Sequence, residues 1–557
     1  MPAEPPPTAA NPSSAAARVP TWTIVGHRLD GAVARTAALY RRTFPDERVR
    51  AALAIGAHLL TLALTAYVFL ILNKRFYYAS QNAYDEPFFV WGGWSITKGL
   101  APYRDFLEFK PPMVFITHAW AQDLFGFKDL GYRKFFTLFP LASLLLLQGV
   151  LIARGIGRWL ALAVVVGVVV LFVSPTWHDT ALTDCESIGL TYYILGLAFL
   201  LWEGRGLKMT TVTGGALLAC CVFSKEPFAP VVGFTWLGLF WLRGKPTPSR
   251  RSVQTYAVYS LLGVAAFVAA LCVYMVPTGA LKAYVALVRS YSVIYRDPKR
   301  SYCVAVGAAH PTTALVGLQI AWEKIRLRFL NLGVLGYLAP IALPGAIFVF
   351  RRSKVLLAVV ILAFAGALWA FTATACHWMH YFNMSMAGVV FVLVVGADSM
   401  RGDCAAARLT RWLACLATLA LIVGFNHRDF TLQQTAHYTR KPWVEPVPGV
   451  LDFIKQNTTP AERIFTTGPP MLYPEADRLS AVRESNIIDE ILGSYDGDTD
   501  EEKLRPIRQQ LDRNKPKVVV LDPEHVSRKG RTYRVLMMPF LAAHKYQKVR
   551  ENLYLLP

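Results

Sequence analysis

Acidic and basic side chains gather in one loop that follows the first hydrophobic run of the chain. Asp85 and Glu86 are adjacent, an Arg104-Asp105 pair comes later, and Lys110 precedes two prolines. Ionisable groups beside a bilayer cost free energy and usually serve a function. A carboxylate in such a place suits a general base or a metal ligand, and a lysine suits an anionic group such as phosphate. We therefore expect the chemistry of this protein in this loop.

Each of these residues also has a simpler explanation. Asp85 stands two residues before Pro87, and this spacing is typical of an N-cap at the start of a helix. Arg104 can pair with Asp105 merely to fold the loop, and a lysine at a helix end can reach toward lipid headgroups. Capping explains neither Glu86 nor the rest of the loop, so we take Asp85 as the candidate base.

The composition identifies the scaffold that must hold this loop. Of 557 residues, 54% are hydrophobic, and the mean hydropathy of +0.35 is too high for a soluble chain of this length. The formal charge is +21, but much of the excess lies in short loops between hydrophobic runs, where it marks cytoplasmic orientation. The sequence shows no basic stripe with interleaved aromatic residues outside the membrane, so we expect no nucleic-acid partner. The predicted fold class is an α-helical polytopic membrane protein.

Hydrophobic runs long enough to cross a bilayer predict about eleven transmembrane helices, with interfacial helices between them. The runs begin near residues 51, 134, 157, 182, 208, 228, 255, 331, 354, 382 and 410. The apolar run 113–127 is short, and we expect a half-inserted or interfacial helix there. With that assignment the loops rich in Lys and Arg fall on the cytoplasmic side, and the unusual polar clusters fall outside.

Three regions follow from this topology. Residues 1–48 form a basic cytoplasmic tail, whose start is rich in Pro, Ala and Ser and is expected to be disordered. Residues 49–426 form the transmembrane domain, with residues 74–133 as its first outer loop. Residues 427–557 are soluble in character and lie outside.

The C-terminal region alternates two kinds of element. Its pattern predicts helices at 450–456 and 503–514 and strands at 463–467 and 517–521. Such alternation is typical of a compact α/β domain. We expect it to act as a lid or docking platform on the outer face.

Further polar residues lie on the outer side in this topology. Asp184 opens an apolar helix, Lys225 stands close to two phenylalanines, and His377 and His380 are three residues apart. Asp184 can simply cap its helix, Lys225 can reach toward headgroups, and the histidines can form an interfacial pair rather than a metal site. Their convergence on one face favours a functional role.

In their order and spacing these motifs resemble the GT-C glycosyltransferases, and within them the branch of protein O-mannosyltransferases and aminoarabinose transferases. The resemblance covers roughly residues 50–426. It rests on the Asp-Glu pair, the segments 99–106 and 110–112, Thr183-Asp184, Ser224-Lys225-Glu226-Pro227, and the segment 377–381. His178-Asp179 and Cys185-Glu186 are additional polar groups that do not match the family pattern.

The resemblance implies an inverting glycosyltransferase with the GT-C fold, which moves a sugar from a polyprenyl-phosphate or polyprenyl-diphosphate carrier to an acceptor hydroxyl. It implies Asp85 as the catalytic base with Glu86 beside it, and phosphate contacts from Lys110 and Lys225. The other candidates for substrate binding are Arg104, Asp105, Asp184, His377 and His380. The Asp85-Glu86 pair also suits a divalent metal such as Mg or Mn, since some relatives use a metal and others do not.

The implied setting is a bacterial inner membrane, with a cytoplasmic N-terminus and with the site and the C-terminus on the periplasmic or extracellular face. The expected partners are the lipid-linked sugar, membrane lipid, and a glycan, lipid or protein acceptor of the cell envelope. Two other function classes stay open. A transporter or flippase for lipid-linked glycans predicts charges along a central path through several helices. A non-catalytic envelope-assembly protein predicts that neutralising Asp85 leaves its function intact.

Overall fold

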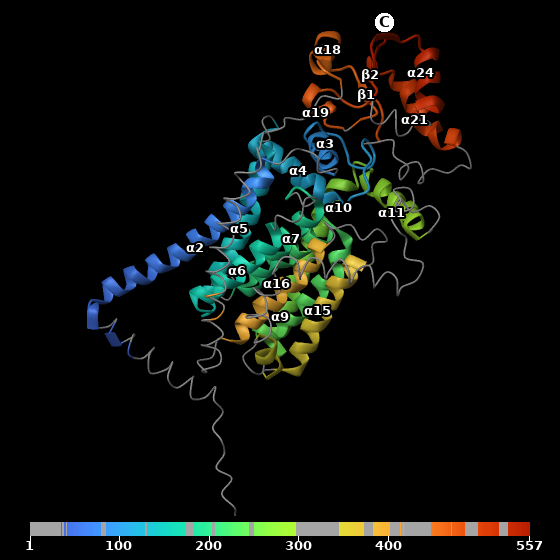
Figure 1. Ribbon diagram of the computed structural model, residues 1–557. Coiled ribbons are helices and arrows are strands. Elements are labelled where there is room, and N and C mark those ends of the chain that lie inside the picture. Colours follow the sequence, from blue (N-terminus) through green and yellow to red (C-terminus); the bar gives the residue numbers. More distant parts are fainter. Residues whose placement is uncertain are drawn as a thin grey trace, which may run out of the picture.

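The structure of the protein is a computed structural model (Figure 1). It describes residues 42–78, 85–127, 131–173, 182–202, 207–243, 250–296, 345–351, 353–372, 382–400, 447–468, 470–484, 500–522 and 533–557, with the isolated positions 35, 38, 39, 413 and 416. His377, His380, the start of the N-terminal tail and most of the runs expected from residues 331 and 410 lie outside the described residues.

Apolar helices form the main body of the structure (Figure 1). They are α2 (Glu47–Tyr78), α5 (Tyr132–Ala153), α6 (Arg158–Val173), α7 (Cys185–Leu201), α8 (Leu207–Val222), α9 (Ala229–Arg243), α10 (Arg250–Met275), α15 (Lys354–Thr372) and α16 (Phe382–Ser399). Within the described residues, three segments are long and apolar enough to cross a membrane: Glu47–Ile71, Tyr132–Ala153 and Val253–Met275. The prediction of a predominantly helical fold with apolar helices able to cross a membrane is confirmed, and the number of crossing helices stays a prediction.

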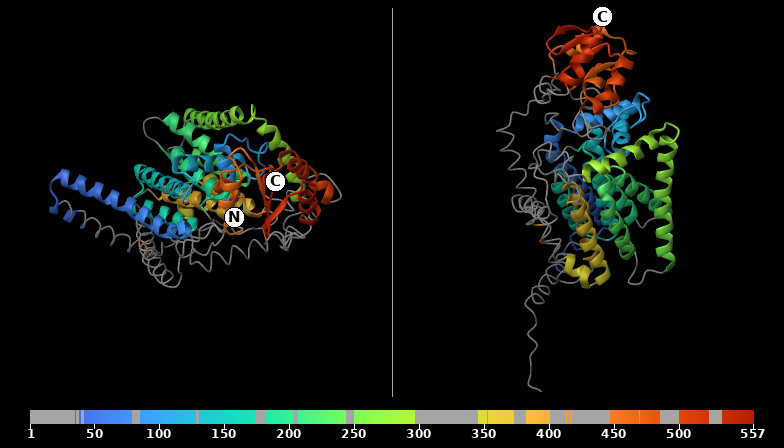
Figure 2. Two further views of the ribbon diagram at one scale, coloured as in Figure 1. Left: turned by 90° about the horizontal axis from the view of Figure 1, so that it is seen from above. Right: turned by 90° about the vertical axis from the view of Figure 1, so that its right-hand side faces the viewer.

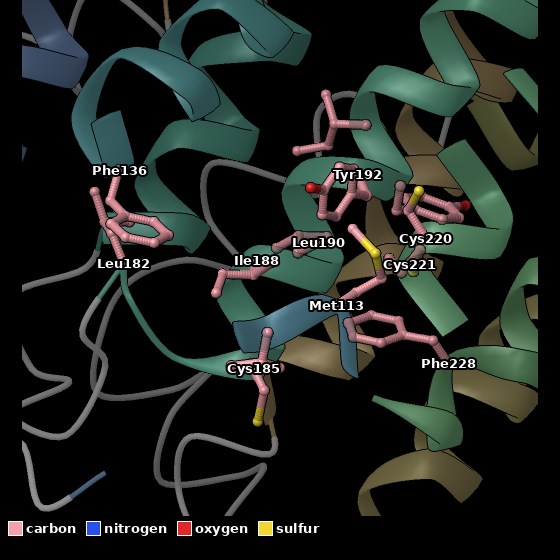
Figure 3. Close-up of a cluster of buried hydrophobic side chains, with 14 of the residues drawn as sticks. Met113, Phe136, Leu182, Cys185, Ile188, Leu190, Tyr192, Cys220, Cys221 and Phe228 are labelled. Carbon is pink, nitrogen blue, oxygen red and sulfur yellow. The ribbon is translucent and has the colours of Figure 1, made fainter. Parts of the chain in front are cut away.

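Helix α7 lies at the centre of this bundle. Nearly all of its residues are buried, as expected for a helix that is hydrophobic all round. Figure 3 shows Met113, Phe136, Cys220 and Phe228 from neighbouring segments around the apolar side chains of α7. A Cβ atom at Gly189 would lie 2.5 Å from the Phe228 ring. Only glycine therefore permits this close contact between α7 and the segment that follows α8.

Two shorter helices flank the loop that carries the candidate residues. They are α3 (Glu86–Thr97) and α4 (Pro112–Phe125), and the residues between them, 98–111, are called the α3–α4 loop below. The 14 residues of α4 span about 21 Å, which is shorter than a hydrocarbon core of about 30 Å. This length agrees with a helix that does not cross the membrane completely. The loop itself contains Tyr103 at a φ of 66°, a left-handed conformation that is uncommon for a bulky residue.

The C-terminal residues form a four-stranded sheet. Its strands β1 (Ile464–Thr466), β2 (Val518–Val520), β3 (Gln547–Arg550) and β4 (Leu553–Leu555) lie in the order β1-β2-β4-β3. β1 and β2 are parallel, whereas β4 is antiparallel to both of its neighbours. The strands and helices predicted from sequence at 450–456, 463–467, 503–514 and 517–521 are confirmed as α18 (Val450–Asn457), β1, α21 (Asp500–Asn514) and β2.

Helices cover both faces of this sheet, because its strands alternate their side chains between two hydrophobic clusters. Val519 faces a cluster with residues of α21 and α24 (Met538–Ala543). Val518 and Val520 face the opposite way, into the core that includes α18 and α19 (Leu472–Ala476). In Figure 1 and in the right-hand view of Figure 2 these elements stand at one end of the helical bundle, above α3 and α4.

The C-terminal elements contact the α3–α4 loop directly. The Leu107 amide donates a hydrogen bond to the Arg483 carbonyl over 2.6 Å. The rings of Trp91 and Tyr473 lie 5.9 Å apart. Tyr473 belongs to α19, so the two apolar clusters of α3 and α19 join into one core. The loop is therefore held between the bundle below and the C-terminal sheet above.

Candidate functional site

Glu86 is buried and forms an ion pair with Arg133. The Arg133 Nη2 donates to Oε2 over 2.6 Å, its Nε donates to Oε1 over 2.9 Å, and the Tyr132 hydroxyl donates to Oε1 over 3.0 Å. Both side chains of the ion pair are 2% exposed. A buried carboxylate needs such partners. Glu86 therefore fastens the start of α3 to the start of α5, and its two oxygens point into the protein rather than toward a substrate.

Asp85 lies in a different environment, although it is the next residue. Its Oδ2 is 3.7 Å from the Lys110 Nζ, and the side chains of Asp85 and Lys110 are 37% and 17% exposed. Asp85 occupies the N-cap position of α3, but within the described residues its side chain makes no capping hydrogen bond. The capping explanation is thus not what the geometry shows. The structure places the candidate base beside Lys110, one of the two candidates for phosphate contact.

Arg104 and Asp105 pair with each other. The Arg104 Nε and Nη2 donate to the two carboxylate oxygens over 2.8 Å and 2.5 Å. Arg104 also donates to the Thr278 carbonyl over 2.7 Å, and Asp105 accepts a hydrogen bond from the Ala101 amide. Partial burial raises the pKa of Asp105, but the hydrogen bonds from Arg104 and Ala101 outweigh this effect and leave the pKa below its ordinary value. These contacts fold the loop, which was the simpler of the two predicted roles.

Tyr103 holds the backbone of Lys110. Its hydroxyl donates to the Lys110 carbonyl over 2.8 Å, and its ring lies 4.8 Å from that of Tyr284 in α11 (Ala280–Arg296). The Tyr284 hydroxyl in turn donates to Glu226 Oε1 over 3.3 Å. Sequence reasoning did not single out Tyr103 for this role. No local sequence pattern indicates this contact, because it depends on how the loop folds back over seven residues.

Lys225 is buried at the end of α8, where it pairs with Glu186. The Lys225 Nζ lies 3.0 Å from Glu186 Oε1, and the Cys185 thiol donates to Glu186 Oε2 over 3.0 Å. Lys110 and Lys225 both lie within electrostatic range of the Cys185 thiol. The Met113 amide also donates to the Phe223 carbonyl over 3.2 Å, which ties the start of α4 to the segment of Lys225.

Asp184 precedes α7 and is 4% exposed. It occupies the N-cap position, yet in the described part of the chain its side chain does not cap α7. The neighbouring Thr183 carbonyl lies 3.0 Å from His118 Nε2, on α4. His118 therefore ties α4 to the start of α7, and sequence reasoning missed it because a single histidine on an apolar helix carries no pattern.

The structure thus brings Asp85 together with Lys110, and it places Lys110 and Lys225 around the same thiol, that of Cys185. Asp85 directly precedes α3, and Lys110 lies at the end of the α3–α4 loop. Lys225 follows α8, and Asp184 precedes α7. Arg133, Tyr132 and Glu186 complete the arrangement and were not among the predicted site residues. Arg133 could have been sought on physical grounds. If Glu86 is buried, a cationic side chain on a neighbouring helix must pair with it.

Asp85 and Glu86 are the residues that the sequence offered as metal ligands. Among the described residues, no three His, Cys, Asp or Glu side chains group in a way that could hold a metal ion. The two oxygens of Glu86 accept hydrogen bonds from Arg133 and Tyr132, and Asp85 faces Lys110. The predicted pairing of Asp85 and Glu86 as common ligands of Mg or Mn does not fit this geometry.

Comparison with known proteins gives structural neighbours only. No family model matches the chain, and no curated protein sequence matches it. The chain is similar to the oligosaccharyltransferase of Archaeoglobus fulgidus in complex with Zn and sulfate, with a TM-score of 0.48, 13% identity, and coverage of 87% of this chain and 71% of that one. It is also similar to ArnT from Cupriavidus metallidurans bound to undecaprenyl phosphate, with a TM-score of 0.46, 13% identity, and coverage of 86% and 95%. Both of these neighbours are GT-C glycosyltransferases.

Proposed function

We propose that this protein is an inverting GT-C glycosyltransferase that uses a polyprenyl-phosphate-linked sugar as donor and a hydroxyl group as acceptor. The observation that carries the proposal is the placement of Asp85 3.7 Å from Lys110, with the buried Lys225 in the same neighbourhood. A base and two cations at one place are what such a transfer requires. The sequence motifs that resemble the GT-C family supply these same residues.

The chemistry follows from the charges. Asp85 accepts the proton of the acceptor hydroxyl while the hydroxyl oxygen attacks the anomeric carbon. The bond from that carbon to the phosphate oxygen breaks on the opposite face, so the configuration at the carbon inverts. The polyprenyl phosphate leaves with the bonding electron pair, and the ammonium groups of Lys110 and Lys225 stabilise its negative charge. Glu86 and Arg133 hold α3 so that Asp85 keeps its position.

The cellular setting extends this proposal. The distribution of Lys and Arg in the sequence supports a cytoplasmic N-terminus and a site on the periplasmic side of a bacterial inner membrane. There the acceptor is a glycan, a lipid or a protein of the cell envelope. The apolar helices accommodate the prenyl chain, while the charged groups at their ends meet its phosphate.

Transfer in lipid nanodiscs tests the proposal. The purified protein is incubated with radiolabelled polyprenyl-phosphate sugars and an envelope extract as acceptor source. Asp85→Asn is expected to abolish transfer, while Asp123→Asn, which neutralises an exposed carboxylate on α4, retains it. Equal transfer by the wild type and by Asp85→Asn would exclude Asp85 as the base.

The same samples distinguish the other function classes. Labelled lipid that crosses the bilayer without transfer to an acceptor would identify a flippase. Complementation of a deletion strain by Asp85→Asn as complete as by the wild type would identify an assembly protein.

A further inference from the structure

Glu186 pairs with Lys225 at the proposed site, but Glu186 itself plays no part in the proposed displacement. The Lys225 Nζ and the Glu186 Oε1 are 3.0 Å apart, and the side chains are 9% and 1% exposed. The second carboxylate oxygen accepts a hydrogen bond from the Cys185 thiol. Glu186 also sits in the first turn of α7, where the helix dipole favours a negative charge.

The backbone around this pair is fixed by independent contacts. The Lys225 amide donates to the Cys221 carbonyl over 3.3 Å, and the amide of Phe228 donates to the Lys225 carbonyl over 3.1 Å. The ring of Phe228 packs against Gly189, one turn along α7 from Glu186. Figure 3 shows this ring beside Met113 and the Cys185 thiol directed away from the apolar cluster. The pair is therefore preformed, unlike two long side chains that meet on a surface.

Lys110 has a different relation to its carboxylate. Its Nζ is 3.7 Å from Asp85, and both of these side chains are more exposed than Lys225 and Glu186. A phosphate group can approach Lys110 while Asp85 keeps its place. At Lys225 an incoming phosphate meets a buried ammonium whose near neighbour is already a carboxylate. Two anions beside one buried ammonium repel each other.

We propose that Glu186 is a displaceable internal counter-ion of Lys225, which gives way to the phosphate of the donor and thereby sets its affinity. This inference rests on the proposed function. In the resting protein Glu186 satisfies the buried ammonium, which an isolated charge in that place would not tolerate. A free phosphate ion gains too little to displace it, whereas a polyprenyl phosphate adds the burial of its apolar chain. Glu186 thus weakens phosphate binding by an amount that the burial of a prenyl chain can offset and that a free phosphate cannot.

Binding measurements with defined probes test this inference. Undecaprenyl phosphate and inorganic phosphate are titrated separately into wild type, Glu186→Gln, Asp398→Asn, and the double variant Glu186→Gln/Lys225→Met. Glutamine keeps the size of the side chain and its ability to accept the Cys185 hydrogen bond. Asp398→Asn is the matched control, because Asp398 also belongs to a buried ion pair, 2% exposed on each side, but one at the far end of α7 from Glu186.

The expected result is that Glu186→Gln tightens undecaprenyl phosphate binding by about tenfold, the order expected when one competing charge is removed at close range. Binding of inorganic phosphate strengthens by a similar factor, because the same carboxylate charge opposes both ligands. Asp398→Asn leaves both affinities at the wild-type value. The double variant does not show this increase in affinity, because no ammonium group remains at position 225 to bind the phosphate.

Unchanged or weaker binding by Glu186→Gln, in a sample whose melting temperature is no lower than that of Asp398→Asn, overturns the inference. A gain that survives in the double variant overturns it too, since the gain then has another source. If Glu186→Gln does not fold, Glu186→Asp draws the charge back by one methylene and is expected to tighten binding by a smaller factor. No binding of undecaprenyl phosphate by the wild type would overturn the proposed function itself, together with the inference.

Discussion

Arg133 holds Glu86 through both of its carboxylate oxygens, at 2.6 Å and 2.9 Å. This contact separates two adjacent acids that the sequence presents as a pair. Glu86 is turned into the helical core, whereas Asp85 stays partly exposed beside Lys110. The two neighbours therefore have different roles, one in holding α3 and one in the proposed proton transfer.

Substitution of these two acids is expected to separate stability from activity. Glu86→Gln leaves Arg133 buried without its counter-charge, so the free energy of unfolding falls by about 3–5 kcal/mol. Asp85→Asn changes stability little but abolishes transfer. Thermal unfolding in detergent and the transfer assay measure the two effects. The double variant Glu86→Leu/Arg133→Met is expected to recover stability, because no buried charge remains. Loss of activity without loss of stability in Glu86→Gln would contradict the anchoring role.

Tyr103→Phe removes the hydrogen bond to the Lys110 carbonyl, of 2.8 Å. Such a bond contributes about 1 kcal/mol, so we expect the KM for the lipid-linked donor to rise about fivefold while kcat changes less. Steady-state kinetics with a varied donor concentration check this split. Tyr284→Phe removes a longer contact of 3.3 Å to Glu226 and serves as the control with a smaller effect. Equal effects from both variants would show that the Lys110 contact is not special.

The junction with the C-terminal sheet is expected to depend on buried contacts rather than on its exposed ion pair. Lys98 and Asp477 are 2.7 Å apart, but their side chains are 41% and 58% exposed, so loss of the charge in Asp477→Asn should cost at most about 1 kcal/mol. Asn also tolerates the left-handed φ of 53° at this position. Tyr473→Leu removes the aromatic contact with Trp91. Hydrogen exchange at the Leu107 amide is expected to accelerate in Tyr473→Leu and to stay unchanged in Asp477→Asn. Faster exchange in the Asp477 variant than in Tyr473→Leu would show that the exposed ion pair, rather than the buried aromatic contact, holds the junction.

Asp105 predicts a pH dependence for the α3–α4 loop. The hydrogen bonds from Arg104 and the Ala101 amide hold its pKa below the ordinary 3.8, in spite of partial burial. A lowered pKa in the folded state contributes stability that is present above pH 3.8 and is lost as the pH falls through the folded-state pKa. Wild type is therefore expected to exceed Asp105→Asn in melting temperature at pH 5–7, and the difference should close below pH 3.8. A difference that persists at the lowest pH would assign the effect to packing.

Arg154 gathers helix ends at the other end of the bundle. It donates to the Leu201 and Leu242 carbonyls over 3.0 Å each and pairs with Asp398 over 3.1 Å. Arg154→Met leaves Asp398 buried without its partner, and we expect a loss of about 3–5 kcal/mol in stability. The affinity for undecaprenyl phosphate should stay unchanged at a temperature where the variant is folded. A changed affinity would show that the two ends of the bundle are coupled.

The sequence by itself determined the apolar helices and most of the charged residues of the candidate site. Long hydrophobic runs have few alternatives to helices in a membrane, because their backbone groups must pair within the segment. The short apolar and β-branched runs at 463–467 and 517–521 were likewise sufficient to predict β1 and β2. Asp85, Lys110 and Lys225 could also be found, since charges at the ends of apolar runs stand out without any knowledge of their partners.

Only the tertiary structure decided which charges meet. Glu86 pairs with Arg133 across 47 positions, and Lys225 pairs with Glu186 across another gap that no local pattern spans. Such contacts depend on how α3, α5, α7 and α8 pack, and packing is set by the shapes of many side chains together. The same holds for the contact between Leu107 and Arg483, which places the C-terminal sheet on the loop. Local pattern fixes what each segment is, and packing fixes what each charged group does.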